Sequence, residues 1–231
     1  VMFQIENEYY FAGLPADVME GQLKSLAKDA WDFGIDVPLF TCWTRPCKGS
    51  SDPVLSRIFD NPNQYPRWNI DSVRWVSEDY GKNQPWAPRT VTEFQGGWFG
   101  QVGGLMSEEQ DGIDHLQINA LTMNALAHGI TGINYYMLFG GTNVGDWGGQ
   151  GILTTYDYFA PIREWGGGGA KYHVVRNIGH FLQEFGPELA RSVREPSLDA
   201  TGSAVVVGRK AASGVLYAFV HNPSRSAGVQ A

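Results

Sequence analysis

The chain has 231 residues, of which 43% are hydrophobic and 13% aromatic, and its formal net charge is −7. This is the composition of an ordinary globular protein, with enough residues for one large domain and a sizeable core. The acidic balance argues against a nucleic-acid partner, because no basic patch is present to displace counterions. No apolar run reaches the roughly 18 residues of a membrane-spanning helix, so we expect no membrane span.

Strand and helix patterns alternate from the first residue. Residues 1–8 predict a buried strand, and residues 17–33 predict an amphipathic helix that ends at Gly34. Residues 37–43 predict a second strand. Residues 48–88 are rich in Pro, Asn and Asp and predict mainly a loop, with at most one short strand. A loop of this length within a compact domain is typical of a segment that covers a site.

The alternation continues in the second half of the chain. Residues 89–94 predict a strand, and residues 114–128 predict a helix. An aromatic strand is expected over residues 132–139. The helical pattern of residues 170–185 ends at Gly186-Pro187, a pair that rarely continues a helix.

Repeated strand–helix units favour a parallel sheet with helical crossovers, which fits either a doubly wound sheet or a (β/α)8 barrel. Glu8, Glu93 and the pair Asn134 and Tyr136 fall at or near the carboxyl ends of different strands. Barrel enzymes assemble their sites at this end of their strands. We therefore predict an α/β chain that forms the C-terminal part of a TIM barrel, strands 4 to 8, over residues 1–194.

The pattern changes near residue 195. Residues 204–207 and 214–221 predict a β-hairpin, which we expect to begin a β-sheet domain over residues 195–231. The first barrel strands are expected upstream of Val1, so the 231 residues alone would carry an open sheet edge. We expect the isolated chain to be inactive although its parent is an enzyme, and we favour a secreted or periplasmic parent.

Two strand ends carry carboxylates. Glu6 and Glu8 lie in the first strand, and Glu93 ends the apolar run that begins at Thr90. A strand end that reaches solvent explains any one of them, but burying several without a purpose is costly. Two carboxylates that face each other across a barrel mouth suffice for glycoside hydrolysis. One protonates the leaving oxygen, and the other attacks the anomeric carbon or activates water.

The segments around these carboxylates resemble the motifs of glycoside hydrolase family 35, the β-galactosidases. Gln4-Ile5-Glu6-Asn7-Glu8-Tyr9 is similar to the family's signature, and the segment from Thr92 to Phe99 is similar to its nucleophile segment. The segments from Asn134 to Asn143 and from Thr155 to Pro161 are similar to its last barrel strand and the loops that follow. Four motifs in the family's order argue against chance similarity.

The resemblance implies a retaining exo-β-galactosidase that removes terminal β-linked galactose from an oligosaccharide or polysaccharide. It implies that Glu8 is the acid/base, that Glu93 is the nucleophile, and that Asn7 hydrogen-bonds the sugar 2-hydroxyl. It also implies that Tyr136 hydrogen-bonds Glu93 and holds it ionised, and that Tyr158 approaches the galactose hydroxyls.

Several aromatic and acidic neighbours are ambiguous. Trp98 is the preferred tryptophan for stacking on the sugar, because it follows the nucleophile segment so closely. Packing is at least as good an explanation for Trp43 and Trp147. Glu6 is expected to support the acid/base carboxylate rather than to contact substrate. Strand alternation places Tyr135 on the core face.

No cofactor is expected. Cys42 and Cys47 are the only cysteines, and neither they nor the five His show the spacing of a metal site. The two thiols fit either a small disulfide loop or two reduced side chains. The glycine-rich stretch from Gly96 to Gly104 lacks the spacing of a phosphate-binding loop.

Two alternatives to a β-galactosidase remain open. A related exo-glycosidase for another sugar, such as a β-glucosaminidase, would use the same pair of carboxylates. A non-catalytic carbohydrate-binding relative is a different class of protein. It is disfavoured, because a binding protein has no need for the charge of either Glu8 or Glu93.

Overall fold

The computed structural model describes residues 1–145, 147–149 and 151–222. Five strands form its centre: β1 (Phe3–Asn7), β2 (Leu39–Cys42), β3 (Ile58–Asn61), β4 (Thr90–Gln95) and β5 (Gly132–Tyr136). β1, β2 and β3 pair in parallel in that order, and β4 pairs in parallel with β5. Gln64 joins the two sets through a parallel bridge to Phe94. The five strands therefore follow one another in chain order, as neighbouring strands of a β/α barrel do.

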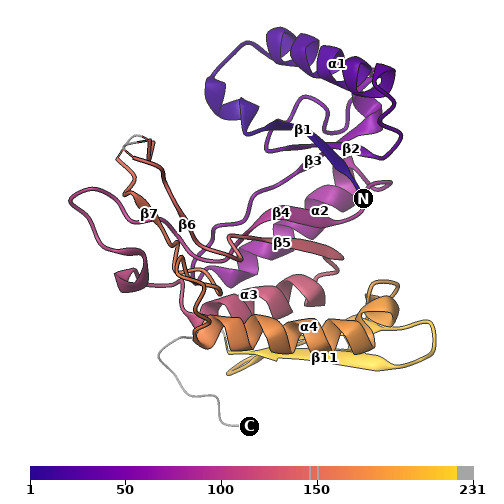
Figure 1. Ribbon diagram of the computed structural model, residues 1–231. Coiled ribbons are helices and arrows are strands. Elements are labelled where there is room, and N and C mark those ends of the chain that lie inside the picture. The colour runs from indigo at the N-terminus through magenta and orange to yellow at the C-terminus, as the bar shows by residue number, and fades with distance from the viewer. Residues whose placement is uncertain (146, 150, 223–231) are drawn as a thin grey trace.

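Helices flank these strands on the outside. The four α-helices are α1 (Ala16–Asp32), α2 (Val73–Asn83), α3 (His115–Ala127) and α4 (Ala170–Leu189). Figure 1 shows α1 above β1, β2 and β3, and α3 and α4 below β4 and β5. In the described part of the chain, no helix has the length and apolarity that crossing a membrane would require.

Two buried clusters hold the helices to the strands. One joins α1 to β2 and β3 through Leu23, Ala27, Leu39, Leu55 and Ile58. The other lies between α2, α3 and the strands β2, β3 and β4. Its buried members are Phe40, Phe59, Ile70, Val73, Val76, Tyr80, Ala87, Val91, Phe94, Leu121, Ala125 and Ile130. Tyr135 packs against this second cluster, which confirms its expected place on the core face.

The segment 48–88 contains the one short strand that the sequence allowed for, but the prediction of a loop around it missed a helix. These are β3 and α2, and Val73, Val76 and Tyr80 of α2 are buried at helical spacing. The Tyr80 hydroxyl donates a hydrogen bond to Asn61 Oδ1 (3.0 Å), which attaches the helix to the end of β3. The many polar residues on the exposed side of this short helix hid its apolar face.

Helix α4 is longer than its sequence pattern predicted. It continues past Gly186-Pro187 to Leu189. Pro187 lacks an N–H donor, but the Ala190 N–H still bonds the Gly186 carbonyl (2.9 Å) across it. The final turn therefore survives the proline.

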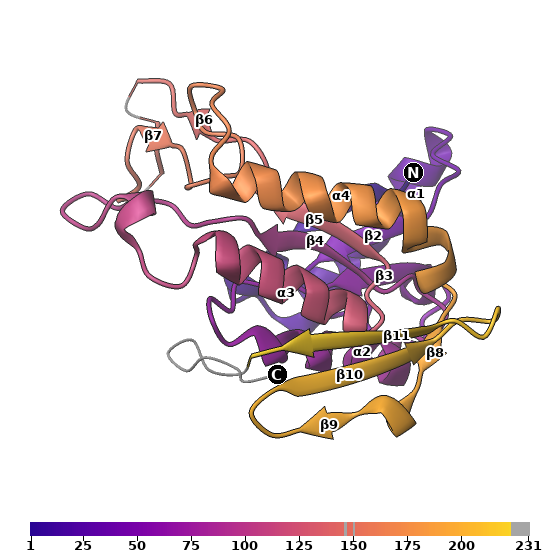
Figure 2. The ribbon, with the colours of Figure 1, turned by 90° about the horizontal axis from the view of Figure 1, so that it is seen from below.

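The predicted C-terminal hairpin is present. It consists of β10 (Val205–Lys210) and β11 (Leu216–His221), and β10 also pairs with β8 (Val193–Arg194) and β9 (Ala200–Thr201). Figure 2 shows this sheet alongside α3. Two further short strands, β6 (Gly141–Thr142) and β7 (Thr155–Tyr156), pair in the loops after β5. Short 3-10 helices are η1 (Tyr9–Ala12), η2 (Leu55–Arg57), η3 (Ile70–Ser72), η4 (Ser107–Glu109) and η5 (Pro196–Leu198).

A buried arginine attaches the C-terminal sheet to the strand–helix part. The Arg209 guanidinium donates to the Ser192 hydroxyl (2.7 Å) and to the Ala127 carbonyl at the end of α3 (3.4 Å). Gly129 makes room for it, because a Cβ there would lie 2.8 Å from Arg209 Nη1. Gly129 also has a φ of +83°, which L side chains rarely adopt.

Candidate active site

Glu8 occupies a tight turn directly after β1. Its backbone is left-handed (φ 55°), and its N–H donates to the Cys42 carbonyl of β2 (2.6 Å). The Glu6 carboxylate stabilises the turn by accepting hydrogen bonds from the Tyr9 N–H (3.0 Å) and the Thr44 hydroxyl (2.9 Å). These contacts agree with the supporting role expected for Glu6. The turn sends the Glu8 side chain toward the carboxyl ends of the neighbouring strands.

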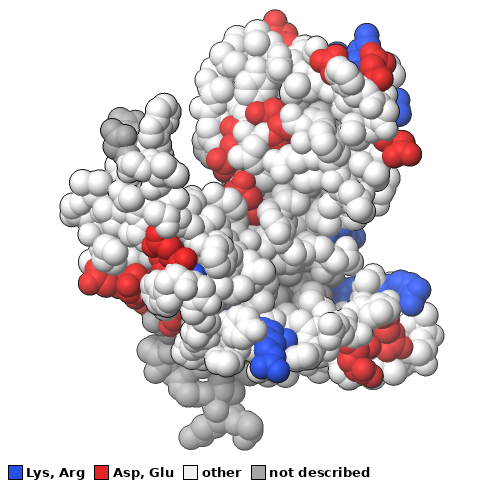
Figure 3. All heavy atoms as spheres, in the orientation of Figure 1, with Lys and Arg blue, Asp and Glu red and all other residues white. Residues whose placement is uncertain are grey.

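Glu93 is held from β4 on the same side of the sheet. Its carbonyl accepts the Gln64 N–H (2.9 Å), and the Gln95 N–H donates back to the Gln64 carbonyl (2.9 Å). These two bonds fix the backbone after β3 against the end of β4. In the space-filling view, acidic side chains lie along the hollow between the upper and lower parts of this face (Figure 3).

A single amide joins the two carboxylates. Asn63 is buried just after β3, and its Nδ2 donates to Glu8 Oε1 (2.6 Å) and to Glu93 Oε2 (3.0 Å). Because both oxygens contact one nitrogen, they lie no more than about 5.6 Å apart, the sum of those two distances. The structure thus brings together the two carboxylates that the sequence placed on different strands.

Tyr65 is the second direct partner of Glu93. Its hydroxyl donates to Glu93 Oε2 (2.5 Å). Burial raises the pKa of the Glu93 carboxyl above its ordinary value, and the nearby charge of Glu8 raises it too. Hydrogen bonds donated by Tyr65 and Asn7 act in the opposite direction and lower this pKa. Tyr65 therefore helps to keep a half-buried carboxylate ionised.

The hydrogen bond expected between Tyr136 and Glu93 is not observed. The Tyr136 hydroxyl instead lies 3.0 Å from the hydroxyl of Tyr156, and Tyr65 takes the place beside Glu93. Strand alternation correctly directed Tyr136 to this face. Its hydroxyl partner, however, depends on the loop that carries β7, which a local sequence pattern does not describe.

Removing the Tyr65 hydroxyl should shift the acid limb of the pH–rate profile. In Tyr65→Phe, Glu93 loses a donor to its ionised form, so its pKa rises further. Since a nucleophile must be ionised, the acid limb of kcat/KM should move to higher pH, and kcat should fall about tenfold at neutral pH. Initial rates across a pH series would measure both effects.

Tyr135→Phe is the matched control for this substitution. It removes the same atom from Tyr135 of β5, whose hydroxyl lies 2.8 Å from the Thr122 hydroxyl in the core. This variant should lose stability without moving the acid limb. Equal pH profiles for the two variants would show that Tyr65 does not tune Glu93.

Aromatic rings form a wall beside Glu93. Trp98 meets Tyr65 edge to face (5.1 Å between centroids) and stacks on Phe99 (4.6 Å). Tyr136 and Tyr158 meet at 5.5 Å, also edge to face. Tyr158 is buried behind these rings, so its direct contact with a sugar stays a prediction. Trp98 and Tyr136 are only half-buried and are better placed for one.

Glycines bring two loops of the site into close contact. A Cβ at Gly97 would lie only 1.7 Å from the Tyr158 carbonyl, so no larger residue fits between the nucleophile segment and the Tyr158 loop. The Lys171 ammonium joins the same loops by donating to the carbonyls of Gly96 (2.8 Å) and Phe159 (2.7 Å). Burial lowers the pKa of Lys171 to about 7. The glycine-rich segment therefore allows these two loops to pack closely against each other.

Two further tryptophans were considered for the site. Trp147 is 87% exposed in the loop after β5. Trp43 stacks on Phe11 (6.2 Å between centroids), near the turn that contains Glu8. Asn7 is exposed at the end of β1 and is accessible to a ligand.

Asn63 and Tyr65 were not predicted from the sequence. Both follow β3, a four-residue strand inside the segment expected to be mainly loop. The rule that located Glu8 and Glu93, polar residues at the carboxyl end of an apolar strand, applies equally to the residues after Ile58 and Phe59. Recognising that short strand would have indicated polar site residues after it, but not that Asn63 and Tyr65 are the ones that reach Glu93.

The two cysteines are free thiols, so the disulfide alternative does not hold. Cys47 lies 3.3 Å from the Thr41 hydroxyl, and Cys42 lies 2.5 Å from Asn63 Oδ1. Burial raises the pKa of each thiol to about 12. Both are therefore protonated at neutral pH.

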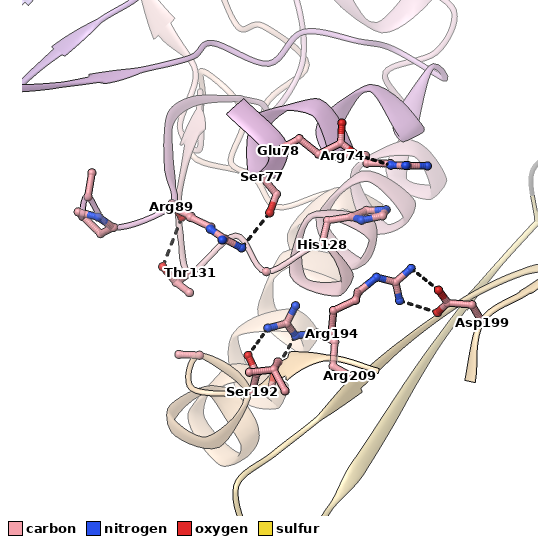
Figure 4. A pocket seen from close by; sticks show the side chains of 15 residues that line it. Arg74, Ser77, Glu78, Arg89, His128, Thr131, Ser192, Arg194, Asp199 and Arg209 are labelled. Atoms are coloured by element: carbon pink, nitrogen blue, oxygen red, sulfur yellow. Dashed lines mark hydrogen bonds and ion pairs between the residues drawn. The ribbon is translucent and has the colours of Figure 1, made fainter. Parts of the chain in front are cut away.

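A separate cavity of about 800 Å³ lies at the opposite ends of the strands, near Arg89 and Thr131. Figure 4 shows arginines around it, and its two carboxylates are both paired: Glu78 with Arg74 and Asp199 with Arg194. Burial and the neighbouring Arg194 and Arg74 lower the pKa of its His128 to about 4. This cavity therefore lacks the free carboxylates that acid/base chemistry would need. Within the described residues, no cluster of three or more potential metal ligands occurs.

A known family matches the part of the chain that contains Glu8 and Glu93. The model of the family described as glycosyl hydrolases family 35 matches residues 1–182. This match covers most of the chain and includes β1 to β5, the aromatic wall and the loops that close it.

The similar curated proteins carry β-galactosidase names. The chain is 30% identical to "Probable beta-galactosidase A" of Aspergillus fumigatus over 200 residues, 79% of this chain and 20% of the relative. It is 36% identical to "Probable beta-galactosidase B" of Pyrenophora tritici-repentis, over 79% of the chain and 21% of the relative. It is 31% identical to "Beta-galactosidase" of Felis catus, over 77% of the chain and 26% of the relative. The chain thus spans about a fifth to a quarter of their length.

Proposed function

The chain belongs to family 35 of the glycosyl hydrolases, and from this premise we propose that it is part of a retaining exo-β-galactosidase. The observation that carries the proposal is the pair of carboxylates on one amide nitrogen. Retaining glycosidases keep their carboxyl groups about 5–5.5 Å apart, whereas inverting enzymes need about 6.5–9.5 Å for a water molecule. One oxygen of each carboxylate contacts the same Asn63 nitrogen, so Glu8 Oε1 and Glu93 Oε2 lie within about 5.6 Å, which is compatible with a retaining arrangement.

Residue roles follow from the surroundings of each carboxylate. Glu93 receives donors from Tyr65, Asn63 and Asn7, which favour its ionised form and suit a nucleophile. Glu8 contacts the shared amide and is only half-buried, so it can protonate a leaving oxygen. In the first step, Glu93 attacks the anomeric carbon while Glu8 transfers its proton to the departing alcohol.

The second step reverses the role of Glu8. Ester formation removes the charge of Glu93, so Glu8 becomes a base that accepts a proton from water. The water oxygen replaces the Glu93 ester bond at the anomeric carbon, and galactose leaves with its original configuration. Asn7, exposed beside Glu93, is proposed to hydrogen-bond the sugar 2-hydroxyl. Trp98 and Tyr136 are proposed to line the sugar.

We also propose how the chain fits into a longer protein. Residues 1–194 would supply strands 4 to 8 of a TIM barrel, which the family implies, and residues 195–231 would begin a β-sheet domain. The parallel order of β1 to β5 supports this placement. The substrate would be a β-galactoside oligosaccharide or polysaccharide.

A 2-deoxy-2-fluoro-galactosyl compound with a good leaving group tests the function on the longer protein that carries this chain. We expect inactivation and a covalent adduct on the peptide with Glu93. With an unmodified β-galactoside as substrate, we expect β-galactose as the first product by NMR. Release of α-galactose first would contradict the retaining mechanism. Binding without an adduct would favour a carbohydrate-binding protein. Faster cleavage of a chromogenic β-glucosaminide than of the β-galactoside would favour the other exo-glycosidase.

A further inference from the structure

Asn63 is anchored more firmly than a loop residue usually is. It is 2% exposed, and the next residue, Gln64, forms two backbone hydrogen bonds with β4. The Gln64 side chain also donates to the Asn63 carbonyl (2.7 Å). The amide of Asn63 therefore projects between β1 and β4 from a backbone that the sheet holds in place.

The Asn63 amide has only one productive orientation. Its Nδ2 carries two hydrogens, and one points to Glu8 Oε1 and the other to Glu93 Oε2. Hydrogen bonds to ionised acceptors are about twice as strong as neutral ones. A flipped amide would place its oxygen against the ionised carboxylate of Glu93 and would repel it. The spacing of the carboxylates thus depends on which way this amide faces.

The Cys42 thiol favours one orientation of the Asn63 amide over the flipped one. Its Sγ lies 2.5 Å from Asn63 Oδ1, and the Thr92 hydroxyl donates to the same sulfur (3.5 Å). Cys42 is fully buried, and burial raises the pKa of its thiol to about 12. The sulfur therefore keeps its proton at neutral pH and can donate it to an oxygen, whereas a flipped amide would present N–H groups to that S–H.

We infer that Asn63 is the positioning residue that holds Glu8 and Glu93 at their working separation, and that the Cys42 thiol fixes the orientation of its amide. This inference rests on the proposed function of the two carboxylates. Neither residue needs to touch substrate. When Glu93 becomes an ester, the bond from Asn63 to Glu8 remains, so the base stays aligned for the second step.

Kinetics of the longer protein that carries this chain would test the arrangement. Asn63→Ala should lower kcat about 10- to 100-fold with a smaller change in KM. The acid limb of kcat/KM should also move to higher pH, because Glu93 loses one donor but keeps Tyr65 and Asn7 and still faces Glu8. Cys42→Ala should lower kcat about threefold to tenfold, and Cys42→Ser, which retains a donor, should restore most of the loss.

Cys47→Ala is the matched control. Cys47 is equally buried on the neighbouring loop and contacts Thr41 rather than an amide of the site. Cys47→Ala should reduce the melting temperature as Cys42→Ala does, while leaving kcat and the pH profile as in the parent. The inference is overturned if Cys42→Ala and Cys47→Ala behave alike, or if Asn63→Ala keeps the parental kcat and pH profile. In either case, labelling of Glu93 in the unsubstituted protein would leave the proposed function standing, whereas no labelling there would overturn both.

Discussion

Glu93→Gln should reduce the hydrolysis of a chromogenic β-galactoside by at least about 10³-fold, because the amide cannot form the glycosyl ester. The substitution keeps the size of the side chain and an oxygen that can accept from Tyr65. The fall should therefore appear in kcat and in kcat/KM, with little change in the binding of a galactoside inhibitor. Initial rates together with an inhibitor titration would measure these effects on the longer protein.

The same variant should be more stable than the parent at neutral pH. The pKa of Glu93 is raised in the folded state, chiefly by burial, so folding favours its protonated form. Ionised Glu93 therefore destabilises the fold as the pH rises above the ordinary carboxyl range. Glutamine removes that charge, and the melting temperature should rise. A variant that is more stable but inactive would indicate that Glu93 serves catalysis at a cost in stability.

Glu184→Gln supplies the control for both measurements. Glu184 is exposed on α4, away from the carboxyl ends of the strands, and the change in charge is identical. It should retain parental rates and a parental melting temperature. Equal activity of Glu93→Gln and Glu184→Gln would remove Glu93 from the mechanism.

The strand-end rule explains why the sequence analysis located Glu8 and Glu93. Each follows a short run of apolar residues, and parallel strands place their carboxyl ends at one edge whatever the details of the loops. Tyr135 and Tyr136 were assigned to opposite faces for the same reason, since side chains alternate along a strand. These inferences need only local patterns and the direction of the strands.

The residues that join the carboxylates depend on contacts between distant segments. Asn63 reaches Glu8 and Glu93 only because Gln64 pairs with β4, a register that no pattern within residues 58–65 describes. The misassigned partner of Tyr136 has a similar cause, because the position of Tyr156 is set by the pairing of β6 with β7. The free thiols could not be predicted either, since their orientation depends on the neighbours of β2.

Glu8→Ala should separate the two steps of the reaction. Without its proton donor, cleavage of a galactoside with a poor leaving group should fall about 10²- to 10⁴-fold, the usual contribution of general acid catalysis. A dinitrophenyl galactoside needs no proton on its leaving group, so Glu93 should still attack it. The galactosyl-enzyme should then accumulate, because no base activates water. An initial burst of dinitrophenolate followed by slow turnover would report this state.

Azide gives the sharpest measurement on Glu8→Ala. Alanine leaves space beside the anomeric carbon, and azide needs no base, so it should restore turnover of the dinitrophenyl galactoside by forming β-galactosyl azide. A product of α configuration would mean that the removed carboxylate was the nucleophile. In a double displacement, Glu93 attacks one face of the sugar and Glu8 serves the other, so the two variants differ in which face they open. The configuration of the azide product therefore assigns the acid/base and the nucleophile without reference to any relative.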